Sequence, residues 1–543
     1  MGVRKGWRGR LKLDKGEVFL PASSVTWPVS HPAIPAINHK SPRRRPAMTS
    51  ALIFERQCIP GEALDRRGAA LAGGLRGLGL KENDAVAVLL RNGPVWADVI
   101  LACRIGGTYY AALNWHLTPP EIAFILADSG AKALIADAAL LPALREILPP
   151  DLPVLAVGTA EGALDYETWL AAQPPYAGPP ASPRGQMGYT SGTTGRPKGV
   201  RRLPIPLGEL PARQARMRRV VEETLGVAEG SRVLVSAPLY HAGPTVIAQN
   251  ALAFGELLVL APRFDAEETL ALIARHRITT VYLVPVMYVR LLRLPPEVRA
   301  RYDMSSLKVV ASTGAPCAPE VKRAMIEWFG PIITETYAST ETGMLTACRA
   351  GDSLARPGTA GRPVADVTLR ILDEEGRDCP PGVVGRIYAR NHAYPDWTYH
   401  NNPGARAAVE HEGLFTLGDM GWLDADGYLY VADRASDMVI SGGVNIYPAE
   451  IEAALLRQPA VLDCAVFGVP DEEYGERLHA VVQLEAGATL DAAALQEGLR
   501  GVLAGFKVPR SYEAVEAMPR DPNGKLLKRK LRAPFWEGRA RAV

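Results

Sequence analysis

The sequence predicts an α/β protein with a large N-terminal domain of parallel sheets and a small α+β C-terminal domain. The chain has 543 residues, which is too long for a single hydrophobic core. From residue 51, segments with helical spacing alternate with short apolar runs typical of buried strands. Such a βαβ rhythm indicates parallel sheets covered by helices. After Arg434 the rhythm changes, and the last stretch of about 105 residues has the size of an independent domain.

The large domain is predicted from apolar runs and from helical spacing, with a small barrel-like part near its end. The expected strands are Ala85–Leu90, Lys132–Ala136, Arg232–Ser236, Leu257–Leu260, Thr280–Val284 and Lys308–Ala311. The expected helices are Leu64–Leu78, Val95–Ile105, Glu267–His276 and Pro319–Phe329. Two further runs, Val364–Leu372 and Val384–Ala389, are separated by turn residues and therefore predict an antiparallel pair. In the C-terminal part we expect helices at Pro448–Leu456 and Leu490–Leu503, and strands at Val461–Val466 and His479–Leu484.

Composition excludes several classes of protein. Hydrophobic residues make up 48% and charged residues 22% of the chain, as in an ordinary globular protein. No run approaches 18 apolar residues, so no membrane span is expected. The six cysteines are scattered without a Cys-x-x-Cys pair, which indicates reduced thiols and a cytoplasmic protein.

The positive charge is concentrated in a leader. Residues 1–47 carry a net charge of +8, so the rest of the chain is −5, which argues against nucleic-acid binding. The leader contains six prolines and lacks the apolar segment of a secretory signal. We expect residues 1–47 either to be disordered or to precede the true translation start at Met48.

The most informative segment is residues 189–200, Tyr-Thr-Ser-Gly-Thr-Thr-Gly-Arg-Pro-Lys-Gly-Val. Glycines allow backbone N–H groups to approach an anion, hydroxyls add donors and Lys198 adds a positive charge. This pattern indicates a polyphosphate-binding loop, although it is not a Walker P-loop. The residues suited to phosphate are Thr190, Ser191, Gly192, Thr193, Thr194, Gly195 and Lys198.

This segment resembles the phosphate loop of the adenylate-forming superfamily, which includes acyl-CoA synthetases, luciferases and peptide-synthetase adenylation domains. The superfamily's other segments follow in order at Tyr337–Glu341, Thr416–Asp419, Asp433–Glu452 and Pro519–Lys525. The resemblance extends from about Met48 to the C-terminus and is greatest to fatty-acid, bile-acid and sterol-acid CoA ligases. It implies an AMP-binding domain at 48–433, a hinge at 434–438 and a mobile domain at 439–543.

The resemblance implies a two-step reaction. A carboxylate attacks ATP to give acyl-AMP and pyrophosphate, and a thiol, expected to be that of coenzyme A, then displaces AMP. The implied catalytic residues are Lys525, Thr340 and Glu341, with Mg²⁺ held by Glu341 and Thr194. Besides the phosphate loop, the implied nucleotide-binding residues are Gly314, Ala315, Pro316, Glu335, Thr336, Tyr337, Ala338, Ser339, Asp419 and Arg434.

Two positions depart from the superfamily pattern. Ala338 stands where glycine is common, and Ser436 stands at the hinge where aspartate or lysine is usual. Small hinge residues are compatible with rotation of the mobile domain. Ser441, Gly442 and Gly443 correspond to a loop that lines the pantetheine tunnel of the superfamily.

The segment Leu239–Pro244 matches the acyl pocket, and His241 corresponds to its aromatic gate. The segment lacks the aspartate of amino-acid-activating domains, and no carrier domain follows residue 543. The remaining pocket candidates are small or uncharged: Ala242, Gly243, Val246, Ser312 and Thr313. We therefore expect an apolar acid, with a fatty acid favoured over bile, sterol or aryl acids.

Two other classes of function stay open beside an acyl-CoA ligase. One is an acyl-AMP ligase that loads a carrier protein, and the other is a catalytically silent binding protein of the same fold. Lys198, Glu341, Asp419 and Lys525 are all present, which disfavours the silent protein. A homodimer is left open by the sequence.

Overall fold

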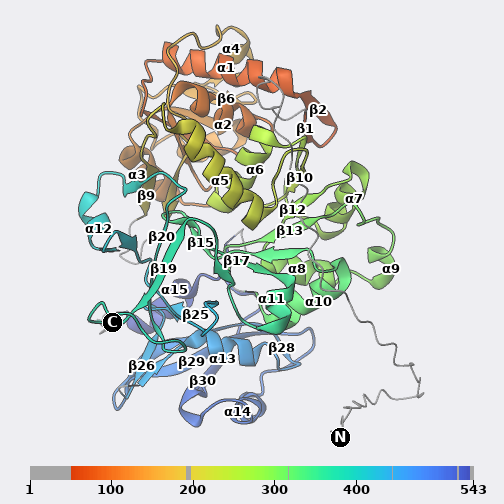
Figure 1. Ribbon diagram of the computed structural model, residues 1–543, viewed down its shortest axis with the longest axis vertical. Helices are drawn as coiled ribbons and strands as arrows, with labels where there is room; N and C mark the ends of the chain where they lie inside the picture. Colours follow the sequence, from red (N-terminus) through yellow and green to blue (C-terminus); the bar gives the residue numbers. More distant parts are fainter. Residues whose placement is uncertain (1–50, 191–196, 316, 443, 522–524, 538–543) are drawn as a thin grey trace, which may run out of the picture. The chain divides into compact units, whose positions relative to one another are not determined.

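The computed structural model describes residues 51–190, 197–315, 317–442, 444–521 and 525–537. It is a mixed α/β structure with a large N-terminal domain of parallel sheets and a smaller C-terminal domain (Figure 1). The fold class predicted from the sequence is confirmed.

The first sheet of the large domain has nine strands among the described residues, in the order β18-β17-β14-β13-β12-β10-β11-β1-β2. Its six central strands, from β14 to β1, are mutually parallel. The strands are β1 (Ala51–Phe54), β2 (Gln57–Pro60), β10 (Arg232–Val235), β11 (Leu257–Leu260), β12 (Thr280–Tyr282), β13 (Val309–Ser312), β14 (Ile333–Glu335), β17 (Thr346–Arg349) and β18 (Arg362–Pro363). The helices among them are α5 (Leu210–Leu225), α6 (Ala242–Phe254), α7 (Ala266–His276), α8 (Pro285–Leu292), α9 (Pro296–Arg299), α10 (Pro319–Phe329) and α11 (Ala350–Ala355).

The second sheet has eight described strands in the order β21-β9-β8-β4-β3-β5-β6-β7. Its strands are β3 (Ala85–Leu89), β4 (Tyr109–Ala112), β5 (Ala131–Asp137), β6 (Val154–Val157), β7 (Leu164–Asp165), β8 (Gln186–Thr190), β9 (Lys198–Arg202) and β21 (Trp397–Tyr399). The helices of this part are α1 (Gly61–Gly77), α2 (Val95–Gly106), α3 (Pro119–Ser129), α4 (Tyr166–Ala171) and the 3₁₀ helix η1 (Ala138–Leu144). All five residues of β3 are buried, because helices cover both faces of a parallel sheet.

The antiparallel part of the large domain is a six-stranded sheet in the described chain, in which β20 pairs with β19, β23 and β24. It is built from β19 (Val367–Leu372), β20 (Gly385–Asn391), β22 (Glu410–His411), β23 (Leu414–Phe415), β24 (Asp419–Leu423) and β25 (Leu429–Arg434), with α12 (Pro403–Ala407) nearby. A short hairpin of β15 (Ala338–Ser339) and β16 (Gly343–Met344) lies in the sequence between β14 and β17 of the first sheet.

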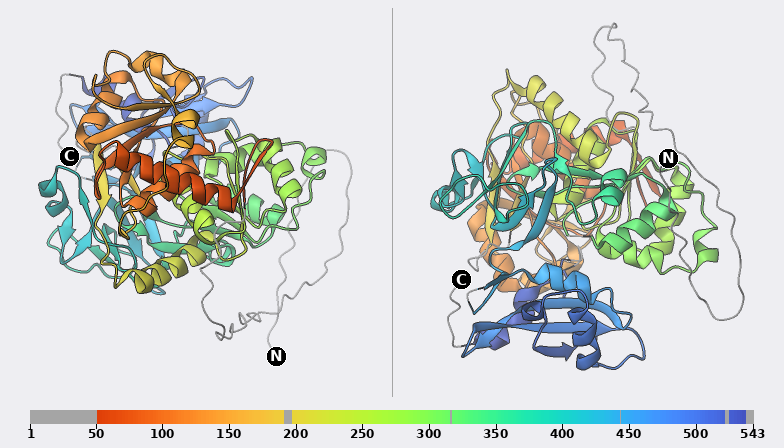
Figure 2. Two further views of the ribbon diagram at one scale, coloured as in Figure 1. Left: turned by 90° about the horizontal axis from the view of Figure 1, so that it is seen from above. Right: turned by 60° about the horizontal axis from the view of Figure 1, so that its bottom comes forward.

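The C-terminal residues gather into one group, coloured blue in Figure 2, around their own buried apolar cluster. Its elements are β26 (Val439–Ser441), β27 (Val444–Ile446), β28 (Val461–Asp471), β29 (Gly475–Leu484), β30 (Ser511–Ala514), α13 (Pro448–Leu455), α14 (Ala492–Arg500), α15 (Lys528–Arg532), η2 (Gly505–Lys507) and η3 (Ala533–Trp536). No helix in the described part of the chain is long and apolar enough to cross a membrane.

Several element boundaries differ from the sequence-based prediction for local reasons. The strand expected at Thr280–Val284 ends at Tyr282, because the chain then turns into α8, with Val284 as its N-cap residue and Pro285 as its first residue. β28 is longer than expected, since it pairs with β29 from Val461 to Asp471. Helix α7 begins where predicted to within one residue, and the Asp265 side chain caps it by accepting from the Glu268 backbone N–H.

Candidate functional site

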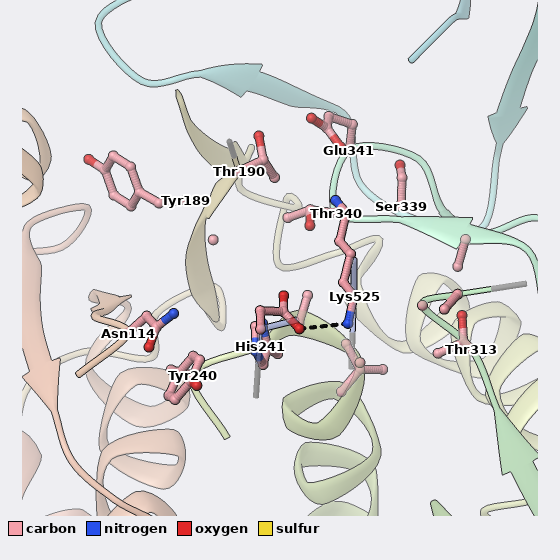
Figure 3. Close-up of a pocket in the computed structure, with 18 of the residues that line it drawn as sticks. Asn114, Tyr189, Thr190, Tyr240, His241, Thr313, Ser339, Thr340, Glu341 and Lys525 are labelled. Atoms are coloured by element: carbon pink, nitrogen blue, oxygen red, sulfur yellow. Dashed lines mark hydrogen bonds between the residues drawn. The ribbon is translucent and has the colours of Figure 1, made fainter. Parts of the chain in front are cut away.

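A cleft of about 3340 Å³ brings together most of the segments that sequence analysis selected (Figure 3). Its lining comes from the β8–β9 hairpin, the N-terminus of α6, the segment after β13, the β15–β16 hairpin and the C-terminal lysine loop. The predicted residues that line it are Thr190, Lys198, His241, Ala242, Gly243, Val246, Thr313, Gly314, Ala315, Ala338, Ser339, Thr340, Glu341, Arg434, Ser436 and Lys525. Residues far apart in sequence therefore share one cavity.

The β8–β9 hairpin carries the predicted phosphate segment. β8 ends at Thr190 and β9 begins at Lys198, and the two residues are cross-strand partners. The intervening residues Ser191, Gly192, Thr193, Thr194 and Gly195, together with Pro316 and Gly443, lie outside the described residues. The Tyr189 hydroxyl donates to Asp128 at 2.7 Å and so ties the hairpin to α3.

Glu341 is 6% exposed and accepts a hydrogen bond of 3.1 Å from the Tyr399 hydroxyl. The Lys198 ammonium lies 5.2 Å from the centroid of the same tyrosine ring. Tyr399 is on β21, which pairs with β9. This strand pairing brings the Lys198 ammonium and the Glu341 carboxylate to the same tyrosine side chain. Burial, followed by the adjacent Glu341 anion, raises the pKa of Tyr399, which keeps its hydroxyl a donor. No motif in the sequence marks Tyr399.

Arg202 holds the backbone of the segment that carries Glu341. Its guanidinium donates to the Thr340 carbonyl at 2.9 Å and to the Pro395 carbonyl at 3.2 Å. Burial lowers the pKa of Arg202 to about 10, against the opposing influence of Tyr394, Glu341 and Asp396. The group therefore stays cationic at neutral pH and adds positive charge beside Thr340. No sequence motif marks Arg202, which ends β9.

Asp419 is held by two residues from different parts of the chain, Tyr337 and Arg434. It accepts from the Tyr337 hydroxyl at 2.5 Å and pairs with Arg434 at 3.4 Å. Asp419 and Arg434 are cross-strand partners on β24 and β25. Burial raises the pKa of Tyr337, and so does the Asp419 charge. Of these three residues only Arg434 is among those lining the cleft.

Glu335 and Thr336 do not line the cleft in the described chain. Glu335 forms an ion pair of 2.7 Å with Lys322, and both side chains are nearly inaccessible. Thr336 donates from its hydroxyl to the Thr346 carbonyl, and its own carbonyl accepts from Thr313 at 2.9 Å. In this structure both residues tie the segment to the core, and their predicted contact with nucleotide stays a prediction.

Lys525 is tied to Asp521 by two hydrogen bonds. The Lys525 backbone N–H donates to the Asp521 carboxylate at 2.8 Å, and the Asp521 N–H donates to the Lys525 carbonyl at 2.9 Å. In Figure 3 the Lys525 side chain extends toward Thr340 and Glu341. Burial lowers the pKa of Lys525, and so does Arg434, while Asp521 and Asp419 act in the opposite direction.

His241 immediately precedes α6, and its ring lies near that of Tyr240, with 4.4 Å between centroids and an angle of 49° between the ring planes. Its buried Nε2 has no hydrogen-bond partner among the described residues. Burial lowers the pKa of His241 to about 4, with Lys525 and His116 adding to the effect and Asp521 opposing it. The imidazole is therefore neutral at pH 7.

The predicted hinge and tunnel residues lie apart from one another. The Ser436 carbonyl accepts from Arg532 at 3.1 Å, and Arg532 also pairs with Asp437 at 3.3 Å. Ser441 ends β26, and Gly442 follows with a φ of 57°, which favours glycine. Neither Ser441 nor Gly442 is among the residues that line the cleft.

The basic residues after Lys525 are not simply a solvated tail. Lys528 pairs with Glu452 at 2.8 Å, and both side chains are largely buried. The adjacent charge of Glu452 raises the pKa of Lys528 despite its burial. This pair ties α15 to α13, whose Glu452 also accepts from the Val466 backbone N–H of β28.

The donor set around Glu341 suits Mg²⁺ rather than a metal held only by protein. No group of three or more His, Cys, Asp or Glu side chains with metal-ligand spacing occurs in the described ranges. Mg²⁺ usually keeps several waters and takes one or two carboxylates together with substrate phosphates. A buried carboxylate that faces a cleft next to Lys198 meets that requirement.

Comparisons with known proteins identify the class. The model of the AMP-binding enzyme family matches residues 38–394, and that of the AMP-binding enzyme C-terminal domain matches residues 450–525. The first match begins inside the segment that sequence analysis assigned to the leader. The chain therefore belongs to the AMP-binding enzyme family, and it is an adenylate-forming enzyme of the acid–thiol ligase class.

Particular relatives differ in acid and in acceptor. A feruloyl-CoA synthase from Amycolatopsis sp is 35% identical over 480 residues, which are 87% of this chain and 93% of that protein. The fatty acid–[acyl-carrier-protein] ligase ScoC from Streptomyces coeruleorubidus is 32% identical over 506 residues, covering 91% and 95%. The structure of the amide bond synthetase McbA from Marinactinospora thermotolerans matches with a TM-score of 0.79 at 28% identity, covering 90% and 97%.

Proposed function

We propose that this protein is an AMP-forming acyl-CoA ligase. It activates a carboxylic acid with ATP to give acyl-AMP and pyrophosphate, and then transfers the acyl group to coenzyme A. The observation that carries the proposal is the convergence of Lys525, Lys198 and Glu341 on one cleft whose wall is formed by α6 and the β15–β16 hairpin.

The first step brings a carboxylate toward a polyanion, so the central need is charge stabilisation. Lys525 is the group proposed to bridge the attacking carboxylate and the α-phosphate. Its burial strengthens its interaction with a developing negative charge, because fewer waters screen it. Lys198 and Thr190 would receive the outer phosphates, and Arg434 with Asp419 would meet the ribose.

Mg²⁺ would be held by Glu341 and would neutralise phosphate charge during the first step. The protein's own contribution is to fix that carboxylate. Tyr399 orients it by a hydrogen bond, and Arg202 holds the adjoining Thr340 carbonyl.

Coenzyme A is favoured as acceptor because CoA-dependent relatives cover most of this chain. The cleft contains Lys525 and excludes Ser441 and Gly442 from its lining, which supports an arrangement suited to acyl-AMP formation. A rotation of the C-terminal domain about Ser436 would then be needed to present residues 441–443. The free cysteines, among them the buried Cys103, Cys348 and Cys464, support a cytoplasmic location.

The test measures release of AMP and of pyrophosphate from ATP for a panel of fatty, aryl and bile acids, with and without coenzyme A. AMP release that needs both an acid and coenzyme A supports the ligase. Pyrophosphate release without coenzyme-A-dependent AMP release would favour a second candidate, an acyl-AMP ligase that loads a carrier protein, for which the similarity to ScoC is the specific observation. Absence of both products with every acid would overturn both.

A further inference from the structure

One face of α6 forms a wall of the cleft. The helix begins after His241, and its core face is buried at Pro244, Thr245, Ile247, Ala248, Ala251 and Leu252. The residues of α6 that line the cleft are Ala242, Gly243, Val246, Gln249, Asn250, Ala253 and Phe254, most of which recur at three- and four-residue spacing. With a rise of about 1.5 Å per residue, Gln249 and Asn250 lie about 9–10 Å further along the helix than Gly243.

The cleft is narrow at Gly243, near the N-terminus of α6. A Cβ atom added to Gly243 would lie 2.6 Å from the Tyr282 hydroxyl and 3.4 Å from the Thr313 methyl group. Glycine is therefore required for the close approach of α6 to Tyr282. A flat group fits beside such a surface better than a branched one.

The wall is polar at Gln249 and Asn250, about one turn before its apolar end at Ala253 and Phe254. The Gln249 amide donates to the Tyr110 hydroxyl at 2.5 Å, and the Asn250 amide donates to the Val246 carbonyl at 2.7 Å. These bonds hold both side chains by their amino groups. Within the described chain no donor is recorded for either amide oxygen, so each is available as an acceptor.

Arg104 adds donors to the same cleft. It lies in the last turn of α2, which packs against α6, and it lines the cleft. Its Nη1 is buried without a hydrogen-bond partner among the described residues. Burial lowers the pKa of Arg104, and the nearby Asp65 only partly opposes this. A buried donor without a partner costs free energy that a ligand oxygen would recover.

We propose that the acid activated by this enzyme is an aromatic acid of arylpropenoate length that carries a hydroxyl group at the far end of its ring. The hydroxyl would donate to Asn250 or Gln249 and accept from Arg104. The inference rests on the proposed ligase function and gives its substrate class. It differs from the fatty acid expected from the sequence, because an alkyl tail would leave these polar groups buried beside it. Each such group costs about 1–3 kcal/mol when its water is removed without replacement.

The experiment compares kcat/KM for 4-hydroxycinnamate, cinnamate, 4-hydroxybenzoate and octanoate, measured as coenzyme-A-dependent AMP release. We expect the wild-type enzyme to favour 4-hydroxycinnamate over cinnamate by about 10- to 100-fold, as one or two charge-assisted hydrogen bonds would give. 4-Hydroxybenzoate is too short to reach the amides from the same carboxylate position and should be a poor substrate.

Asn250→Leu keeps the side chain's size and removes its amide, so the ratio between the two cinnamates should fall to within about threefold. Gln173→Leu is the matched control. The Gln173 amide also donates to the carbonyl four residues earlier, that of Trp169 on α4, and neither residue lines the cleft. If Asn250→Leu does not yield folded protein, Gln249→Met is judged by the same ratio.

A wild-type ratio near one, or octanoate as the best substrate, would overturn the inference while leaving the ligase function intact. A ratio that survives both substitutions would also overturn it. Absence of AMP release with every acid would instead remove the function on which the inference rests.

Discussion

Replacing Tyr399 by phenylalanine tests how Glu341 is held. The substitution removes the hydroxyl that donates to the Glu341 carboxylate at 3.1 Å. It keeps the ring, which packs against Trp397 with 5.0 Å between centroids and lies beneath the Lys198 ammonium. The change is therefore confined to one hydrogen bond in a site that is almost closed to solvent.

The magnitude follows from the charge and the burial of the acceptor. A hydrogen bond to a charged group contributes about 1.5–3 kcal/mol. Glu341 is 6% exposed, so water cannot readily replace the hydroxyl. Since about 1.4 kcal/mol corresponds to a factor of ten, we expect the apparent affinity for Mg²⁺·ATP to fall by about 10- to 100-fold, with a smaller change in KM for the acid.

The assay measures acid-dependent pyrophosphate release while ATP is varied at several Mg²⁺ concentrations. Tyr512→Phe is the control, because the Tyr512 hydroxyl is buried without a partner among the described residues and lies in the C-terminal domain. A KM for Mg²⁺·ATP within twofold of wild type in Tyr399→Phe would refute the role given to this hydrogen bond. An equal rise in KM for the acid would show a general disturbance of the cleft instead.

Three further predictions concern charge. Lys525→Ala should slow acyl-AMP formation by about 10²–10³-fold and spare thioester formation from supplied acyl-AMP; equal loss of both steps, measured separately, would contradict its role. Lys322→Ala should lower the free energy of unfolding by about 3–5 kcal/mol, because it leaves the buried Glu335 carboxylate unpaired, and urea unfolding beside the Lys132→Ala surface-pair variant checks this. For His241, whose folded pKa is about 4 against an ordinary value near 6.5, the unfolded state binds more protons between these values. Its neutral form thus stabilises the protein above pH 6.5, and this contribution is lost as the pH falls toward 4. The free energies of unfolding of wild type and His241→Phe are compared at pH 5 and 7; an equal difference at both pH values would disprove the prediction.

The buried pair of Glu335 and Lys322 shows where sequence reasoning stops. A motif position gave Glu335 a predicted contact with nucleotide, which stays a prediction; the structure adds an ion pair with Lys322 on α10, the helix that precedes β14. The pairing depends on the packing of α10 against β14, which no local pattern records. The same holds for Tyr399 and Arg202, whose importance comes from the pairing of β21 with β9.

The sequence by itself determined the α/β class, the order of the main strands and helices, and the segments that meet in the cleft. These features follow from short-range patterns in the sequence. The spacing of apolar residues predicts helices and strands, and a run of glycine and hydroxyl residues predicts a phosphate-binding loop. Only the tertiary structure decided which side chains face the cleft and which are tied into the core, the neutral state of His241, and the polar pair of Gln249 and Asn250 in the α6 wall. Those properties depend on contacts between residues distant in sequence and on the water that their packing removes.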